Sequence, residues 1–248
     1  MLRLGVSGVC GKMGKRIAAL ALDDPKIKLT AALEKDGTDF VGKDLGVVLG
    51  KKKMGLTINA DLDDIHSKID VLIEFSSPQA TLAHLEAARK QKIAMVIGTT
   101  GMDADGEKKI KAASKKIPIV FSPNMAVGMN VLFNIVKEAA SVLGDSCDIR
   151  IDETHHVHKK DAPSGTAKMI VKVVEAACGK HLPVEVFREG EVIGNHGIIF
   201  ENKYEKLEIR HDAKSRDVLA DGAIKAAKFL SGKKSGLYGM ADVLALKK

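Results

Sequence analysis

Residues able to transfer protons and bind anions are concentrated in one run of the sequence, Glu153–Thr166, which reads E-T-H-H-V-H-K-K-D-A-P-S-G-T. Three histidines and two lysines lie at the end of a predicted strand, and Pro163, Ser164 and Gly165 then begin a predicted helix. Histidine transfers protons near neutral pH, and lysine can donate a proton or bind a carboxylate. The free N–H groups at a helix start, with the hydroxyls of Ser164 and Thr166, suit a carboxylate. The run therefore predicts proton transfer beside an anion-binding helix start.

Two other interpretations of this run stay open. His156 and His158, two residues apart on a strand, could chelate a metal ion. No cysteine or third-ligand pattern nearby completes a zinc set, so we expect no metal. The run could also be a solvated basic loop. That interpretation would not explain the helix start that follows so closely, although it stays possible for Lys160.

A second chemical motif is the glycine turn Gly8–Gly14, which follows a predicted strand and opens a predicted helix. Its glycines allow a tight turn, close approach of the backbone to a phosphate, and close packing of the helix on the sheet. The helix N-terminus then offers N–H groups and a partial positive charge to a pyrophosphate. The spacing is G-x-x-G-x-x-G, and a glycine-rich turn without a ligand is the alternative. The expected cofactor-binding residues here are Gly8, Val9, Cys10, Gly11, Lys12 and Met13.

The choice of cofactor depends on charges near this turn. Glu34 ends the next predicted strand, where a carboxylate can accept hydrogen bonds from an adenosine ribose. Lys35 follows it, and Lys12 lies within the turn, so both lysines could reach a ribose 2′-phosphate. Each lysine could equally be an ordinary surface charge. We therefore expect both NADH and NADPH as cofactors.

Two further segments lie at the carboxyl ends of predicted strands, the edge where open α/β sheets bind ligands. Small polar residues at Gly98, Thr99 and Thr100 allow close approach to a nicotinamide riboside, and a second turn follows at the switch between domains. The residues of this second turn are Ser122, Pro123, Asn124 and Met125. Phe75–Pro78 occupies an equivalent position. Each segment could also be an ordinary strand-to-helix turn with an N-cap.

The elements that must position these residues change character along the chain. In the first half, short apolar runs alternate with amphipathic stretches, which predicts βαβ units and a mostly parallel sheet. The predicted strands are Leu2–Ser7, Lys28–Leu33, Leu56–Asn59, Val71–Phe75, Ala94–Gly98 and Pro118–Phe121, and the predicted helices are Lys12–Leu22, Pro78–Gln91 and Asp103–Lys115. The segment Asp36–Met54 fits no clean period and predicts a loop.

After Asn124 the pattern predicts a different, α+β unit with an open, largely antiparallel or mixed sheet. The predicted helices are Asn130–Leu143 and Gly165–Cys178, and the predicted strands are Asp148–Thr154, Val184–Phe187, Gly197–Glu201 and Lys206–His211. An Ala-rich helix at Asp217–Leu230 then resumes the character of the first half. The predicted fold is an α/β Rossmann-like dinucleotide-binding domain plus an α+β substrate-binding domain with an open mixed sheet.

The composition narrows the class of protein. Lys and Arg exceed Asp and Glu by 39 − 32 = 7 over 248 residues, which favours anionic partners. The lysine runs are not interleaved with aromatic residues, so we expect no nucleic acid. Three widely separated cysteines predict neither a disulfide framework nor a structural zinc site. No signal-peptide pattern and no apolar segment of roughly twenty residues is present, so we expect no membrane and a cytoplasmic location.

These motifs occur together, in this order, in a known family. The residues that carry the resemblance are Gly8–Gly14, Phe75–Pro78, Gly98–Gly101, Asn124, Gly128, Asn130, His155–Thr166, Arg188–Gly190, Gly194–Gly197 and Glu208–His211. The most specific of them is His155–Thr166. With these residues the sequence resembles the 4-hydroxy-tetrahydrodipicolinate reductase family over essentially the whole chain.

The resemblance implies NAD(P)H-dependent reduction of 4-hydroxy-tetrahydrodipicolinate to tetrahydrodipicolinate, with loss of water, in diaminopimelate and lysine biosynthesis. It implies His155 as the general acid/base and Lys159 as the proton donor. The small cyclic dicarboxylate would be held by His156, Lys159, Ser164, Gly165 and Thr166. It also implies a dinucleotide-binding domain at 1–126, completed by 213–248, and a substrate-binding and oligomerisation domain at 127–212 that forms a homotetramer through its sheet.

Two other functions compete with this one. An aldehyde-forming dehydrogenase of the aspartate-semialdehyde type needs an activated cysteine with a histidine base. Cys147 lacks that context and Cys10 lies in the glycine turn, so we reject it. A non-catalytic NAD(P)-sensing protein is the remaining alternative. It could keep the glycine turn and Glu34, but it would have no need of His155–Thr166.

Overall fold

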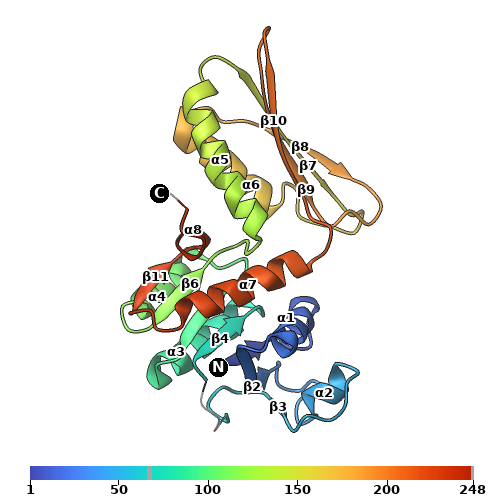
Figure 1. The fold of residues 1–248 in the computed structure, drawn as a ribbon, viewed down its shortest axis with the longest axis vertical. Helices are drawn as coiled ribbons and strands as arrows, with labels where there is room; N and C mark the ends of the chain where they lie inside the picture. Colours follow the sequence, from blue (N-terminus) through green and yellow to red (C-terminus); the bar gives the residue numbers. More distant parts are fainter. Residues whose placement is uncertain (66–68, 247–248) are drawn as a thin grey trace. The chain divides into compact units, whose positions relative to one another are not determined.

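The computed structural model describes residues 1–65 and 69–246, which form two compact units (Figure 1). Unit 1 comprises Met1–Met125 and Leu219–Ala245, and unit 2 comprises Ala126–Val218 together with Leu246. Unit 1 is therefore discontinuous in sequence, with unit 2 inserted into it. Residues 247 and 248, at the end of the segment expected to complete the first domain, lie outside the described residues.

Unit 1 is built on a seven-stranded sheet in the order β11-β6-β5-β4-β1-β2-β3, in which every neighbouring pair is parallel. Its strands are β1 (Leu2–Ser7), β2 (Ile27–Leu33), β3 (Ile58–Asn59), β4 (Val71–Glu74), β5 (Ala94–Ile97), β6 (Pro118–Phe121) and β11 (Gly236–Tyr238). The order from β3 to β6 is that of Rossmann nucleotide-binding sheets, with the switch in strand order between β1 and β4.

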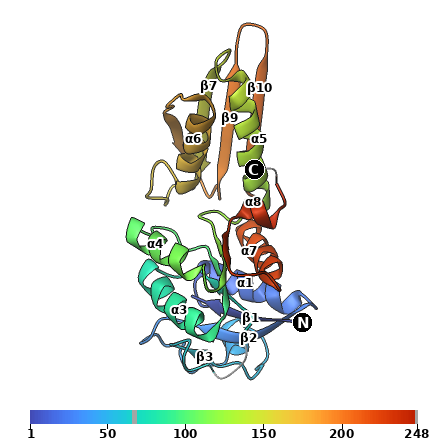
Figure 2. The same cartoon turned by 90° about the vertical axis from the view of Figure 1, so that its left-hand side faces the viewer.

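Helices cover both faces of this sheet (Figure 2). On one face, α1 (Lys12–Asp23) and α7 (Asp217–Leu230) share a core with Leu4, Val6 and Ile73. On the other, α3 (Pro78–Gln91) and α4 (Ala104–Ala113) share a core with Leu72 and Ile97. Burial on both faces explains why the central strands are continuous apolar runs rather than alternating ones.

The short elements of unit 1 differ from the sequence prediction. The predicted loop Asp36–Met54 contains a one-turn helix, α2 (Leu45–Val48), which is too short to produce a periodic pattern. The strand expected at Leu56–Asn59 shrinks to the two residues of β3. Neither β11 nor the helix α8 (Met240–Val243) was predicted from the sequence. A three-residue strand such as β11 exists because it pairs with β6, and that pairing leaves no local signal.

Unit 2 contains a four-stranded sheet in the order β10-β9-β7-β8. Its strands are β7 (Asp148–His155), β8 (Val184–Arg188), β9 (Asn195–Glu201) and β10 (Lys206–Asp212). The pair β7–β8 is parallel and the other two pairs are antiparallel, so the sheet is mixed, as predicted. The two helices α5 (Val127–Leu143) and α6 (Gly165–Cys178) lie on the same face of the sheet (Figure 1). The two-part fold class expected from the sequence is confirmed.

Side chains along β7 alternate between buried and more exposed positions. Ile149, Ile151, Glu153 and His155 are buried, whereas the residues between them are partly or fully exposed. The buried face of the strand thus begins apolar and ends with two ionisable groups. Since buried ionisable groups need partners, the end of β7 is the place in unit 2 where a site is expected.

Among the helices that the structure describes, none is both long and apolar enough to cross a membrane.

Candidate active site

The glycine turn after β1 is closely packed. Gly8 has φ +66°, and a Cβ there would lie 2.5 Å from the carbonyl oxygen of Phe75. A Cβ on Gly14 would collide with the carbonyl oxygen of Gly8, so glycine lets α1 pack directly on the turn. Gly11 caps α1 without a side-chain hydrogen bond. This is a cradle of backbone N–H groups that suits a pyrophosphate.

Glu34 is held at the end of β2 by two backbone donors. The Cys10 N–H donates to its Oε2 at 2.8 Å, and the Lys35 N–H donates to its Oε1 at 3.0 Å. The carboxylate therefore faces the glycine turn. Burial, reinforced by the charge of Glu34, raises the pKa of the Cys10 thiol to about 11. Because the thiolate is the nucleophile, this thiol is unsuited to covalent catalysis.

In the two other turns expected to contact a cofactor, several side chains form hydrogen bonds within the protein or pack in its core. The hydroxyl of Thr99 is buried and accepts a hydrogen bond from the Ser76 N–H at 3.2 Å, whereas Thr100 is exposed. The Ser122 hydroxyl donates to the Asn124 carbonyl at 2.8 Å. Met125 is buried in the core shared with α7.

The structure brings all the predicted cofactor-binding residues to one edge of the unit 1 sheet. The glycine turn follows β1, Glu34 follows β2, and the turns at 98–100 and 122–125 follow β5 and β6. Since these strands are parallel, their carboxyl ends lie at the same edge, where open α/β sheets bind nucleotides.

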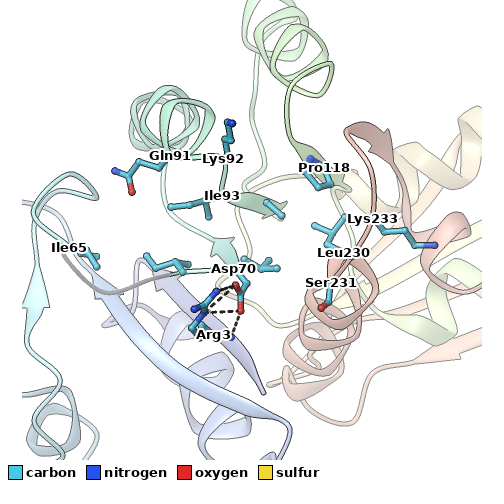
Figure 3. A pocket seen from close by; sticks show the side chains of 14 residues that line it. Arg3, Ile65, Asp70, Gln91, Lys92, Ile93, Pro118, Leu230, Ser231 and Lys233 are labelled. Carbon is cyan, nitrogen blue, oxygen red and sulfur yellow. Dashed lines mark hydrogen bonds and ion pairs between the residues drawn. The ribbon is translucent and has the colours of Figure 1, made fainter.

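A cavity of about 640 Å³ in unit 1 lies at the opposite edge of the sheet (Figure 3). Its lining includes Val71, Ala94 and Pro118, the first residues of β4, β5 and β6. The ion pair between Arg3 and Asp70 borders it, and Arg3 holds the pKa of Asp70 below its usual range. This cavity is separate from the edge that carries the glycine turn.

In unit 2, charged and polar groups converge on the carboxylate of Glu153, which is fully buried. The Ser164 N–H donates to its two oxygens at 3.1 and 3.2 Å. A guanidinium nitrogen of Arg188 lies 3.5 Å from Oε1. His155 Nδ1 and His196 Nε2 each lie 3.6 Å from Oε2. This cluster joins the end of β7 to β8, β9 and the start of α6.

Burial controls the protonation of the two histidines. It lowers the pKa of His155 from its ordinary value, while the nearby charge of Glu153 opposes the shift. Burial, helped by His155, lowers the pKa of His196 to about 4. Both imidazoles are therefore neutral at neutral pH, and His155 is suited to accept a proton. A Cβ on Gly194 would lie 3.2 Å from His155 Nε2, so a glycine keeps this edge of the ring open.

The two lysines of the run have different surroundings. Lys159 is 21% exposed, and its Nζ lies 2.8 Å from Oδ1 of Asp161. The hydrogen bond from Lys159 lowers the pKa of Asp161. Lys160 is exposed, as is His158, whose Nε2 lies 3.4 Å from Glu191. Of the two lysines, Lys159 is thus the one placed for chemistry.

The helix start at α6 is built as an N-cap. Ser164 is 2% exposed, and its hydroxyl accepts a hydrogen bond from the Ala167 N–H at 3.1 Å. Gly165 is exposed and faces open space. His156 Nε2 lies 3.5 Å from a guanidinium nitrogen of Arg216, a residue that the sequence analysis did not single out. The exposed Gly165 and the positive end of the helix give the start of α6 the character of an anion site.

The structure also groups three possible metal ligands, which are not the pair considered from the sequence. One ligand atom from each of Glu153, His155 and His196 lies within 4.8 Å of the others. The Glu153 carboxylate already accepts a hydrogen bond from the Ser164 N–H and pairs with the positive charge of Arg188. The cluster therefore needs no cation to balance its charge. The rings of the pair considered from the sequence, His156 and His158, have centroids 6.1 Å apart.

Neither Glu153 nor Asp161 was predicted from the sequence as a site residue. Arg188 and His196 appeared only within the family resemblance. The signal for Glu153 and His196 was present, because both occupy inward positions on strands whose other inward residues are mostly apolar. An ionisable residue at such a position marks a buried network.

Comparisons with known proteins agree with this geometry. Residues 2–125 match the family model for the dihydrodipicolinate reductase N-terminus, and residues 128–244 match that for its C-terminus. The chain is 40% identical to the 4-hydroxy-tetrahydrodipicolinate reductase of Methylococcus capsulatus and 38% identical to that of Anaeromyxobacter dehalogenans. In both cases the match covers 100% of this chain and 99% of the relative.

Solved structures show the same fold. A dipicolinate-bound dihydrodipicolinate reductase from Paenisporosarcina sp. TG-14 has a TM-score of 0.79 at 21% identity, covering 98% of each chain. An amine dehydrogenase from Mycobacterium smegmatis has a TM-score of 0.68 at 12% identity, covering 95% of this chain and 94% of its own.

Fold and site together define a pyridine-nucleotide-dependent oxidoreductase with a Rossmann-like domain. The chain belongs to the dihydrodipicolinate reductase family. A non-catalytic sensor, the alternative kept open by the sequence, is not consistent with this family of enzymes.

Proposed function

We propose that this protein reduces 4-hydroxy-tetrahydrodipicolinate to tetrahydrodipicolinate with NAD(P)H, releasing water, in diaminopimelate and lysine biosynthesis. The observation that carries the proposal is the buried cluster around Glu153 beside the Lys159–Asp161 ion pair. The names of the relatives and the dipicolinate bound to the Paenisporosarcina enzyme support this substrate class.

The substrate carboxylates bind at the start of α6 in this proposal. The residues involved are His156, Lys159, Ser164, Gly165 and Thr166. The exposed Gly165 and the cationic Lys159 support the assignment, since an anion needs N–H donors and positive charge together. The Ser164 hydroxyl already caps the helix, so its contribution is to hold the helix start in place.

Proton transfer is assigned to His155 and Lys159. The nicotinamide, when bound, supplies the hydride, and the ammonium of Lys159 supplies the proton that accompanies it. His155 is buried and neutral, which suits it to take a proton from the ring carbon beside the carbon that carries the hydroxyl and to pass it to that hydroxyl, so that water leaves and the imidazole is neutral again. Asp161 keeps the Lys159 ammonium in position until the substrate carboxylate competes for it.

The cofactor is assigned to the carboxyl edge of the unit 1 sheet, where the close-packed glycine turn fits a pyrophosphate. Glu34, held by Cys10 and Lys35 N–H groups, keeps further acceptor capacity for ribose hydroxyls. Lys12 and Lys35 offset its repulsion of a 2′-phosphate. Both cofactors should therefore work, with NADH somewhat preferred.

The effect of ionic strength on cofactor use tests the proposed preference for NADH over NADPH. Exposed lysines contribute modest, screened attraction, so raising the ionic strength should weaken NADPH use more than NADH use. Replacing both Lys12 and Lys35 by alanine should abolish the difference. A KM for NADPH that is unchanged in the double variant would show that neither lysine contacts the phosphate.

A homotetramer formed through the unit 2 sheet is also proposed. Both helices of unit 2 lie on one face of that sheet. Arg188 points to the buried Glu153, so its neighbour Phe187 points to the other face, where it is 51% exposed. The cytoplasmic location and the absence of a nucleic-acid partner stay predictions.

Oxidation of NADH on addition of the cyclic substrate is the decisive experiment. The absorbance of the reduced cofactor should fall only when enzyme, cofactor and substrate are all present. An enzyme that binds NADH but never oxidises it with this substrate would contradict the proposal.

A further inference from the structure

A second buried ion pair lies in unit 1, below the edge assigned to the cofactor. Glu74 ends the apolar strand β4 and is fully buried, and its Oε2 lies 2.7 Å from Nδ1 of His84 on α3. The His84 side chain is 13% exposed. A carboxylate in the core of a parallel sheet is costly unless it is paired, and nothing in the proton transfers assigned above uses this one.

Hydroxyl groups extend this pair across neighbouring strands. Ser7, the last residue of β1, has its hydroxyl 3.3 Å from His84 Nδ1. The Ser76 hydroxyl donates to the other oxygen of Glu74. The Thr99 hydroxyl donates to the Glu74 carbonyl at 3.4 Å and receives a hydrogen bond from Thr81 on α3 at 2.9 Å. The ends of β1, β4 and β5 are thereby tied to one helix.

The turn held by this network, which begins at Phe75, lies between two glycines of the cofactor edge, Gly8 and Gly98. The carbonyl oxygen of Phe75 faces Gly8, where a Cβ would lie only 2.5 Å away. The Phe75 ring occupies the space that a Cβ on Gly98 would need. A shift of Phe75 and Ser76 would therefore displace both the glycine turn and the turn at Gly98. The position of the whole edge depends on how Glu74 is held.

We propose that Glu74 and His84 are positioning residues for the nicotinamide cofactor, holding the turns after β1, β4 and β5 in their binding geometry. The proposal rests on the proposed function, because it assigns the cofactor to this edge. Neither residue is placed on substrate or reacting atoms. Their loss should therefore weaken cofactor binding and leave the chemical step at saturation largely intact.

Protonation of His84 should be visible in cofactor binding. Burial lowers the pKa of His84, but the hydrogen bond and charge of Glu74, with the charge of Asp61, outweigh it and raise the pKa overall. The charged pair is thus complete below this raised pKa. As the pH rises through it, His84 becomes neutral and Glu74 stays buried without a countercharge. Cofactor affinity should consequently fall on the alkaline side.

The test compares full-length variants by fluorescence titration with NADH and by steady-state kinetics. Glu74→Gln and His84→Gln should each raise the Kd and KM for NADH by about tenfold or more. The kcat at saturating NADH and the inhibition constant of pyridine-2,6-dicarboxylate should change by no more than about threefold. Glu74→Asp should restore part of the affinity. Glu86→Gln, an exposed change on α3, should behave as wild type.

The pH profile separates positioning from general destabilisation. The wild-type Kd for NADH should rise as the pH is raised above the ordinary pKa of histidine and through the raised pKa of His84, and His84→Gln should remove this rise. Variants that bind NADH like wild type, or a wild-type Kd that does not change with pH, would overturn the proposal. Should Glu74→Gln fail to fold, the wild-type profile and Glu74→Asp still decide. A wild type that binds neither NADH nor NADPH would instead contradict the proposed function.

Discussion

At the scale of single residues, Lys159 and Lys160 are neighbours in sequence with different environments. Lys159 is mostly buried and paired with Asp161, whereas Lys160 is exposed. Lys159→Ala should lower kcat by a factor on the order of 10² to 10⁴, the usual range for a positioned proton-transfer group. Its NADH affinity should stay near that of wild type, because the glycine turn belongs to the other unit. Lys160→Ala is the control, and near-native turnover of Lys159→Ala would remove Lys159 from catalysis.

A substitution of Thr166 tests whether the substrate carboxylates bind at the start of α6. Thr166→Val removes a hydroxyl while conserving shape, so a carboxylate oxygen loses a donor at a cost of roughly 1–3 kcal/mol. The inhibition constant of pyridine-2,6-dicarboxylate should rise accordingly, and inhibition should be competitive with the substrate. If the variant bound this inhibitor and its monocarboxylate analogue like wild type, the anion site would lie elsewhere.

The lowered pKa of His196 predicts that the folded protein loses stability in acid. Its pKa is about 4 in the folded chain and about 6.5 when exposed, so the unfolded state binds the extra proton between these values. Stability should therefore be complete above about pH 6.5 and decline as the pH falls toward 4, by up to about 3 kcal/mol from this residue. Chemical denaturation at about pH 7 and pH 5 measures the decline. His196→Gln should reduce it, and an unchanged slope would contradict the assignment.

The sequence could predict site residues that act through a local pattern, but not those brought together by strand pairing. His155, Lys159 and Ser164 belong to one continuous run. Glu153 gains its partners His196 and Arg188 only because β9 and β8 flank β7. Glu74 and His84 likewise meet through the packing of α3 on the sheet. A charged residue closing an apolar strand was the available signal for Glu74.

At the scale of elements, the glycine turn and α1 form one rigid unit. Gly14→Ala would force a Cβ into the Gly8 carbonyl, so α1 must move away from the turn. The variant should bind NADH much more weakly and melt at a lower temperature. Gly239→Ala, where nothing lies within 4 Å of the added Cβ and φ is −113°, is the matched control. Equal NADH affinity in both variants would show that the close approach is not needed.

Long elements were predicted well and short ones were not, for a physical reason. The helix Asp217–Leu230 matched its predicted bounds because its buried alanines repeat at the helical period. The elements α2, β11 and α8 have three or four residues each, too few for a periodic pattern to repeat. The partner strand of β11, β6, is also distant in sequence, so no local window contains it.

At the scale of the whole molecule, the proposed homotetramer can be tested at the outer face of the unit 2 sheet. Phe187 projects from β8 beside the charged Glu185 and is half exposed. If this face joins subunits, Phe187→Glu should convert a tetramer into smaller species, because it buries an unpaired charge. Sedimentation velocity measures this change. Val142→Glu, an exposed position on α5, should leave the assembly unchanged, and a tetramer that persists in Phe187→Glu would place the interface elsewhere.

The discontinuity of unit 1 sets an order of events during synthesis on the ribosome. The sheet and helices of unit 2 all come from the single stretch Ala126–Val218, whereas unit 1 must wait for α7 and β11, which follow that stretch. Until α7 emerges, the apolar surface that its alanines cover, beside Val6 and Ile73, has no partner. A nascent chain with such a surface is prone to aggregate or to bind chaperones. The inserted unit can therefore mature first, and the nucleotide-binding unit becomes competent only after α7 and β11 have been synthesised.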